Sequence, residues 1–138
     1  MKAFETSIQV RFGHVDPAGI AYYPRLFDYI HDAFEELWEE HVGQRYYHLL
    51  LERRIGFPLV ASKVNFHHPL RFGDRPKVQV STVSIGRSSL CLRFLFQLQD
   101  QVCLDAEMTT ACVDLETMQS IPIEPALRER FEALREDS

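Results

Sequence analysis

A long amphipathic pattern from Pro24 to about His41 predicts the main helix of this chain. Its apolar side chains recur at steps of three and four residues, whereas Asp and Glu fill much of the opposite face. Proline suits the first turn of a helix, because the amide that it lacks would have no partner there. The helix is rich in large aromatic side chains, so we expect it to form the centre of the core. Its apolar positions are Leu26, Phe27, Ile30, Phe34, Leu37 and Trp38.

Alternating or β-branched runs on both sides of this helix predict strands. One run, Glu5–Phe12, comes before the helix, and a shorter helix at Gln44–Arg54 follows it and ends before Gly56. The short turns between the later runs favour antiparallel hairpins, so these strands are expected to form a meander. The later runs are Phe57–His68, Pro76–Ile85, Ser89–Gln99 and Val102–Leu115, and a charged, peripheral helix is expected at Pro125–Glu136.

This order of elements predicts an α+β fold, in which a five-stranded antiparallel sheet curves around the long helix. The chain has 138 residues and neither repeats nor an interdomain linker, so we expect one domain over residues 1–138.

The three cysteines, Cys91, Cys103 and Cys112, lie in apolar runs without a CxxC spacing. We therefore expect buried, reduced thiols rather than disulfides or a zinc site.

Composition and charge narrow the class of protein. Hydrophobic residues make up 46% of the chain and charged residues 25%, which is typical of a globular protein. The formal net charge of -5 argues against general nucleic-acid binding. No apolar run approaches the ~18 residues of a transmembrane helix, and the first five residues lack the apolar core of a signal peptide. A cytoplasmic location without a membrane span is therefore expected.

The turn before the long helix carries the candidate chemistry. Asp16 lies in a Pro/Gly-containing turn beside a helix N-terminus, where free amides stabilise developing negative charge. A helix cap or an Asx turn is the structural alternative for Asp16. Gly19 either lets the chain approach a ligand closely or only forms the turn. His14 is either a polar neighbour that tunes Asp16 or an exposed residue at the end of a strand.

Two stretches of this sequence resemble a known family. They are the turn Asp16-Pro17-Ala18-Gly19-Ile20-Ala21-Tyr22-Tyr23-Pro24 and the later segment Val64–Asp74, with its Pro69 and Gly73-Asp74. Together they resemble the hotdog-fold acyl-CoA thioesterases, specifically the 4-hydroxybenzoyl-CoA thioesterase family of the aspartate type. The resemblance covers about Phe4 to Pro122. It implies an enzyme whose sheet wraps the helix, whose subunits pair edge to edge as a homodimer, often within a homotetramer, and whose active sites lie between subunits.

The resemblance also assigns roles to residues of the turn. It implies that Asp16 is the catalytic carboxylate, acting either as a nucleophile on the thioester carbonyl or as a general base on water. It implies that the backbone N–H of Tyr23 stabilises the oxyanion, which agrees with the free amides expected at a helix start. Many relatives carry a histidine in place of Tyr23, so tyrosine indicates the branch that hydrolyses aryl-CoA esters such as 4-hydroxybenzoyl-CoA or benzoyl-CoA.

Further positions are candidates for contact with an acyl-CoA substrate. His31 lies on the apolar stripe of the helix and either reads a substituent of the acyl group or is a core-edge histidine. Arg87, Ser88 and Ser89 follow Gly86 in a turn that resembles the region where the family contacts CoA phosphates. An ordinary exposed turn is the alternative. Coenzyme A is part of the substrate, so no separate cofactor is expected.

Other chemistry fits the sequence less well. His67 and His68 suggest a metal site, but adjacent strand residues point to opposite faces of a sheet, so we expect no metal there. A broad thioesterase for short or medium acyl chains is the second enzyme hypothesis. A non-catalytic hotdog domain that binds acyl-CoA is the third, although the intact turn at Asp16 disfavours it.

Overall fold

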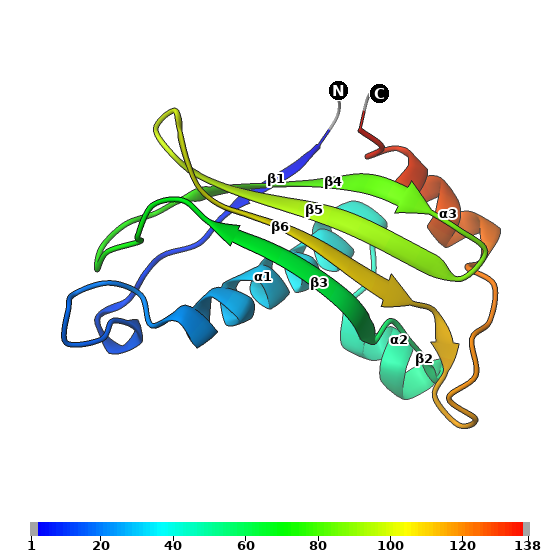
Figure 1. Ribbon diagram of the computed structural model, residues 1–138. Coiled ribbons are helices and arrows are strands. Elements are labelled where there is room, and N and C mark those ends of the chain that lie inside the picture. The colour runs from blue at the N-terminus through cyan, green and yellow to red at the C-terminus, as the bar shows by residue number, and fades with distance from the viewer. Residues whose placement is uncertain (1–2, 137–138) are drawn as a thin grey trace.

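The long helix lies across the concave face of a curved antiparallel sheet (Figure 1). The computed structural model describes residues 3–136. Helix α1 (Tyr23–Leu37) begins after an extended Tyr22 and has Pro24 in its first turn. It continues into a π-helical turn, η2 (Trp38–Val42), which ends at Gly43 in the left-handed region with φ 93°. The predicted helix is therefore confirmed, and the predicted α+β fold with it.

The sheet has five strands in the order β1-β4-β5-β6-β3. Its strands are β1 (Phe4–Ser7), β3 (Leu59–Phe66), β4 (Lys77–Ile85), β5 (Ser89–Leu98) and β6 (Gln101–Ala111). The hairpins β4–β5–β6 agree with the prediction, but β3 does not pair with β4. It crosses to the far edge and pairs with β6, so the predicted four-stranded meander is wrong. The segment 67–76, which contains Pro69 and Pro76, is too long for a hairpin and makes this crossing instead.

The first predicted strand is only half right. β1 ends at Ser7, and the chain then turns through a short 3-10 helix, η1 (Phe12–His14). Between them Val10 is fully buried, its amide donates to the carbonyl of Asp74, and its carbonyl accepts from Gly73. These bonds join the segment before η1 to the β3–β4 connection rather than to a neighbouring strand, because β1 pairs with β4 only as far as Lys77.

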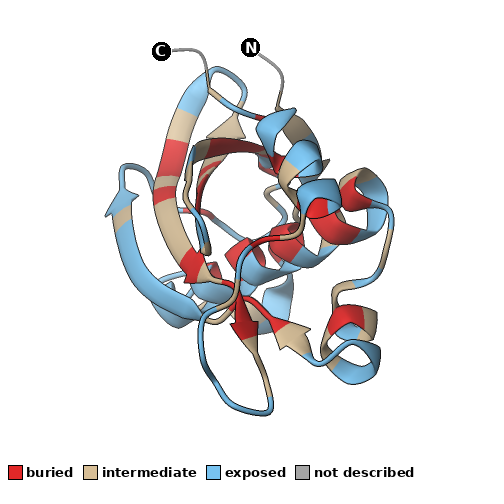
Figure 2. Cartoon of the chain, turned by 90° about the vertical axis from the view of Figure 1, so that its right-hand side faces the viewer, coloured by how far each residue is buried: buried red, intermediate tan, exposed pale blue. Residues whose placement is uncertain are grey.

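Shorter elements complete the fold. Helix α2 (Tyr46–Glu52) confirms the predicted second helix, and the short strands β2 (Ile55–Gly56) and β7 (Val113–Asp114) pair with each other beside it. The last helix, α3 (Pro125–Glu132), packs at the end of β4. Figure 2 shows the buried residues gathered on the inner side of the sheet and on the helix side that faces it.

The C-terminal helix belongs to the core, so the prediction that it is peripheral is wrong. Phe131 is fully buried and its ring lies 5.6 Å from that of Trp38, edge to face. The hydroxyl of Thr82 donates to the carbonyl of Phe131 at 2.7 Å. Beyond α3, Leu134 is buried as well, and the following residues form a bridge with Thr82 on the part of β4 that β1 leaves unpaired. The tail therefore covers an otherwise open strand edge.

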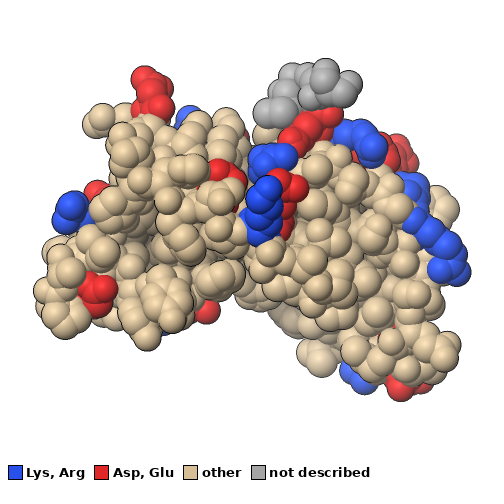
Figure 3. Space-filling model, in the orientation of Figure 1, with Lys and Arg blue, Asp and Glu red and all other residues tan. Residues whose placement is uncertain are grey.

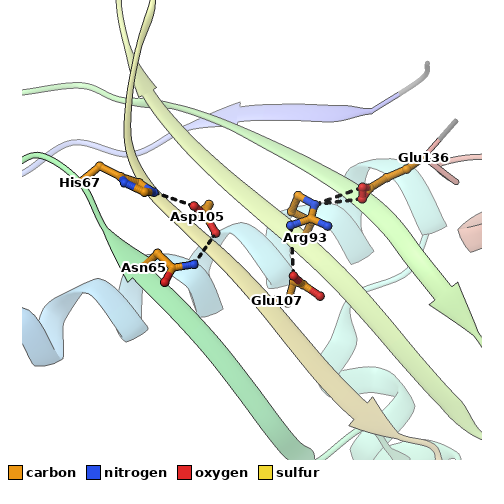
Figure 4. Close-up of polar contacts among 6 residues, drawn as sticks. All are labelled: Asn65, His67, Arg93, Asp105, Glu107 and Glu136. Atoms are coloured by element: carbon orange, nitrogen blue, oxygen red, sulfur yellow. Dashed lines mark hydrogen bonds and ion pairs between the residues drawn. The ribbon is translucent and has the colours of Figure 1, made fainter. Parts of the chain in front are cut away.

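Polar pairs cover the sheet face turned away from α1 (Figure 4). Arg93 bonds both Glu107 and Glu136, which fastens the tail to β5 and β6. Asp105 accepts from Asn65 at 3.1 Å and bonds His67 at 2.7 Å, and the hydrogen bond from His67 lowers the pKa of the Asp105 carboxyl. On the face shown in Figure 3, basic and acidic side chains lie intermixed.

The cysteines and the helices within residues 3–136 bear on two further expectations. Cys91, Cys103 and Cys112 are buried free thiols, as predicted. None of the helices described is long and apolar enough to cross a membrane.

Candidate active site

Asp16 lies in a tight loop that closes on itself before α1. Its backbone amide donates to the carbonyl of Ile20 at 2.9 Å, and Val15 forms an antiparallel bridge with Ala21. The side-chain oxygen Oδ1 of Asp16 accepts from the amide of Ala18 at 2.8 Å, which is the Asx turn considered from the sequence. Within the part of the chain described, Oδ2 has no hydrogen-bond partner. The turn therefore orients the carboxylate and leaves one oxygen available for chemistry.

Gly19 allows the loop to turn. Its φ of +83° lies in the left-handed region that side chains disfavour, and nothing lies within 4 Å of where a Cβ would stand. The geometry supports the turn interpretation directly, because the backbone angle requires glycine whether or not a ligand approaches.

Tyr23 provides a free amide beside this loop. It is the first residue of α1, and its backbone N–H forms no hydrogen bond within residues 3–136. The next residue is Pro24, which has no amide, and Arg25 already donates to the carbonyl of Tyr22 at 2.8 Å. The Tyr23 side chain is exposed. An unpartnered amide at a helix N-terminus is suited to binding an oxyanion.

Two hollows lie between α1 and the sheet, one at each end of β3. The first, of about 310 Å³, adjoins the Asp16 loop and is called the entrance hollow; it is lined by Ile20, Ala21, Tyr23, Leu26, residues 66–70, Cys103 and Leu104. The second, of about 350 Å³, is called the apolar hollow and lies toward the start of β3. It is lined by Phe27, Ile30, His31, Phe34, Tyr46, residues 57–59, Leu92, Phe94, Met108 and Thr110.

His31 lies at the wall of the apolar hollow. Its side chain is 58% exposed, so it is not a core histidine, and its Nε2 lies 2.9 Å from Glu35 Oε2 one turn along α1. His31 is the basic side chain in an otherwise apolar and aromatic lining, apart from the hydroxyl groups of Tyr46 and Thr110. It is therefore suitably located to contact a polar group on a ligand in this hollow.

The turn containing Arg87, Ser88 and Ser89 lies at the other end of the sheet from Asp16 (Figure 1). Arg128 of α3 donates to the carbonyls of Gly86 and Arg87 at 2.8 and 3.2 Å. The carbonyls of Arg87 and Ser88 also accept from Ile123 and Cys112. These bonds fix the turn and leave the Arg87 side chain exposed. Within one chain, the turn lies far from Asp16, at the opposite end of the sheet.

The comparisons with known proteins identify the family. The sequence signature described as the thioesterase-like superfamily matches residues 10–131. The chain belongs to this superfamily. The match spans the Asp16 loop, α1 and every strand from β2 to β7. The predictions of a thioesterase enzyme and of a hotdog fold are confirmed, whereas the narrower assignment to the 4-hydroxybenzoyl-CoA branch stays a prediction.

Three similar proteins illustrate the range of this superfamily. A 1,4-dihydroxy-2-naphthoyl-CoA hydrolase from Synechococcus elongatus is 23% identical over 121 residues, covering 87% of this chain and 88% of the relative. The long-chain acyl-CoA thioesterase FadM of Escherichia coli K12 is 24% identical, covering 94% and 98%. The solved structure of a gentisyl-coenzyme A thioesterase superposes with a TM-score of 0.82 at 26% identity, covering 94% and 99%.

Two residues that contact the candidate residues, Tyr29 and Arg128, were not predicted from the sequence. The Tyr29 hydroxyl lies 2.9 Å from Nδ1 of His14, next to the Asp16 loop. A signal existed, because Tyr29 is a polar-tipped residue beside the buried helix positions. The contact of Arg128 with the turn at Arg87 joins residues about 40 positions apart and leaves no local pattern.

His67 and His68 are the residues whose sequence suggests a metal site. His67 bonds Asp105 on the outer face of the sheet, and no group of three or more His, Cys, Asp or Glu side chains within residues 3–136 is arranged to hold a metal ion. His67 and His68 line the rim of the entrance hollow, and both also line an open hollow beside Arg93 and Asp105 on the outer face.

Proposed function

We propose that this chain hydrolyses acyl-CoA thioesters, with Asp16 as the catalytic carboxylate and the Tyr23 amide as an oxyanion donor. The observation that carries the proposal is the pairing of a carboxylate, held by one oxygen and free at the other, with an unpartnered helix-start amide. A thioester carbonyl under attack develops negative charge on oxygen, which such an amide stabilises. Membership of the thioesterase-like superfamily supports the same chemistry.

Asp16 serves one of two routes. In the first, its free oxygen attacks the carbonyl carbon, the C–S bond breaks, CoA leaves as a thiolate, and water hydrolyses the resulting mixed anhydride. In the second, Asp16 takes a proton from a water molecule that attacks instead. Rapid quenching and mass spectrometry separate the two routes. An acyl group on the peptide that contains Asp16 indicates direct attack, and its absence at full turnover indicates the general base.

The proposed enzyme is a homodimer joined along β3. This strand pairs with β6 on one side only, and its free edge carries the exposed apolar side chains Leu59, Val60 and Phe66. A long apolar edge strand is prone to pair with another chain, so a second copy is the expected cover. A two-fold axis perpendicular to the sheet joins two such edges antiparallel, with the helices on the same face. Pairing of dimers would give the homotetramer expected from the resemblance.

The strand register supports a site built from both subunits. Thr110 of β6 lies between Leu59 of β3 and Leu90 of β5. The start of β3 and the turn at Arg87 therefore lie at the same end of the sheet. Phe66 belongs to the other end, where Ala21 of the Asp16 loop bonds the carbonyl of Leu70. Antiparallel pairing would bring Asp16 of one subunit toward the apolar hollow and the turn 87–89 of the other. Arg87, Ser88 and Ser89 would then contact CoA phosphates from the partner side.

The proposed substrate carries a hydroxylated aromatic acyl group. Two of the similar proteins described above are named for such groups, the dihydroxynaphthoyl and gentisyl esters of CoA. The apolar hollow has aromatic walls for a ring, and His31 at its wall would read a ring hydroxyl. 4-Hydroxybenzoyl-CoA and benzoyl-CoA are the monocyclic candidates. A second candidate, an unbranched acyl chain, is favoured by the size and mainly apolar lining of the hollow, at about 350 Å³, and by the similarity to FadM.

A free-CoA release assay tests these proposals. The panel should include benzoyl, 4-hydroxybenzoyl, 1,4-dihydroxy-2-naphthoyl, gentisyl, and short, medium and long straight-chain CoA esters. We expect the highest kcat/KM for a hydroxylated aryl ester. A preference for a straight chain would favour the second candidate, and no release from any ester would favour a binding domain. His31→Ala should change the preference between 4-hydroxybenzoyl-CoA and benzoyl-CoA, whereas an unchanged ratio would remove His31 from recognition.

A further inference from the structure

We propose that His14 is a positioning residue for Asp16: its neutral Nδ1 accepts a hydrogen bond from the buried Tyr29 hydroxyl and so fixes the Asp16 loop against α1. The proposal rests on the proposed function, because it concerns the same carboxylate. It adds a residue on α1, Tyr29, whose side chain would act only through His14.

The hydrogen-bonding groups determine which atom donates. Tyr29 is only 2% exposed, and its hydroxyl has His14 Nδ1 as its hydrogen-bond partner, at 2.9 Å, within residues 3–136. Burial raises the pKa of Tyr29, so the phenol keeps its proton and can donate it. The amide of Arg11 also points at Nδ1, at 3.4 Å, and an amide can only donate. Nδ1 is therefore the acceptor, and the neutral imidazole carries its proton on Nε2.

His14 connects the loop to α1 at two separate points. Its carbonyl accepts from the amide of Tyr22, the residue directly before the helix, at 2.9 Å. Its side chain contacts Tyr29, which lies six residues after Tyr23, the first residue of α1. At a rise of 1.5 Å per residue, Tyr29 is roughly 9 Å along the helix axis from Tyr23. Two attachments that far apart fix the direction of the segment that leads to Asp16. A displacement of about 1 Å in a reacting group can cost about 100-fold in rate.

The surroundings of His14 are polar. His14 lines a polar hollow of about 320 Å³, and the backbone amide of Arg11 points at its Nδ1. Protonation of Nδ1 would remove the acceptor from both Tyr29 and Arg11. The pKa of the Asp32 carboxyl is raised, chiefly by burial, and this carboxyl lines the same hollow as His14. The other residues of the polar hollow, all on α1, are Arg25, Asp28, Tyr29, His31 and Asp32.

Substitutions can separate the acceptor from the ring. In His14→Asn the amide oxygen stands at the same bond distance from the backbone as Nδ1, so the acceptor is kept without a titrating group. In His14→Gln the amide extends to the position of Nε2, so the acceptor is misplaced. Tyr29→Phe removes the donor and leaves the ring packing. Tyr47→Phe, which removes an exposed hydroxyl on α2, is the matched control.

The test measures kcat and KM from pH 5 to 9 with the best thioester substrate. We expect His14→Gln and Tyr29→Phe to lower kcat about 10- to 100-fold with little change in KM, and His14→Asn and Tyr47→Phe to stay within about threefold of the parent. Parent-like kcat in His14→Gln or Tyr29→Phe, or a kcat for His14→Asn as low as that of His14→Gln, would overturn the proposal.

A second measurement keeps this inference separate from the proposed function. If the parent protein releases no CoA from any ester, the proposed function fails, and amide hydrogen exchange then decides the role of His14. Faster exchange at the Asp16 and Tyr22 amides in Tyr29→Phe and His14→Gln, but not in His14→Asn, would support the positioning role. Equal exchange in all four proteins would refute it.

Discussion

Truncating Phe131 should destabilise the whole fold, because this side chain joins the C-terminal helix to the core. Phe131 is fully buried and packs against Trp38 at 5.6 Å and Phe57 at 6.4 Å between ring centroids. Replacing a fully buried Phe by Ala costs about 3 to 5 kcal/mol. With a urea m-value of about 2 kcal/mol per molar, Phe131→Ala should lower the unfolding midpoint by about 2 M.

Urea unfolding followed by circular dichroism, at one fixed protein concentration, measures this shift. Arg130→Ala is the matched control, because Arg130 is exposed on the same helix and its loss should change the free energy of unfolding by no more than about 0.5 kcal/mol. A midpoint for Phe131→Ala within about 0.3 M of the control would contradict the reasoning, since α3 would then lie on the surface without contributing to the core.

Three further predictions test the β3 edge, the loop and the outer face. Val60→Asp should place a charge in the proposed β3–β3 contact, so the protein should sediment as a monomer and release no CoA. Met118→Asp changes another exposed apolar residue and should leave both the dimer and CoA release unchanged. Gly19→Ala and Gly43→Ala both place a side chain at positive φ and should each lose about 1 kcal/mol in urea unfolding, but only Gly19→Ala should lower kcat. The pKa of Asp105 is lowered in the folded protein, so its carboxylate stabilises the fold at pH values above the unfolded-state pKa of about 3.9. This stabilisation is lost as the pH falls through the pKa of Asp105 in the folded protein. The Tm difference between the parent and Asp105→Asn should therefore shrink below about pH 4.

Local patterns were sufficient to predict most of the helices and strands and the Asx turn at Asp16. The spacing of Leu26, Ile30 and Phe34 predicts α1 because each helix residue contacts its neighbours three and four positions away. The turn at Asp16 is also local, since its Asx hydrogen bond spans only two residues. The resemblance added the hotdog arrangement, which periodicity alone does not specify.

Long-range placement was not predictable in the same way. Whether β3 pairs with β4 or with β6 depends on the crossing of segment 67–76, and the residues of β3 itself do not select one neighbour over the other. The tail looked peripheral because Arg and Glu dominate it, although Leu127 and Phe131 lie one turn apart on one side. Similarly, the partner of His14 lies 15 residues away on α1, so the sequence shows a polar-tipped Tyr29 beside buried helix positions but not which residue it contacts.

The most direct test of the central claim is CoA release by Asp16→Asn. Asparagine keeps a side-chain oxygen that can accept from Ala18, so the loop and the Tm should be preserved while the carboxylate is lost. We predict that a folded Asp16→Asn protein releases CoA at least about 1000-fold more slowly than the parent, and that the exposed control Asp100→Asn matches the parent. Near-parent release by folded Asp16→Asn would show that this carboxylate does not carry the reaction.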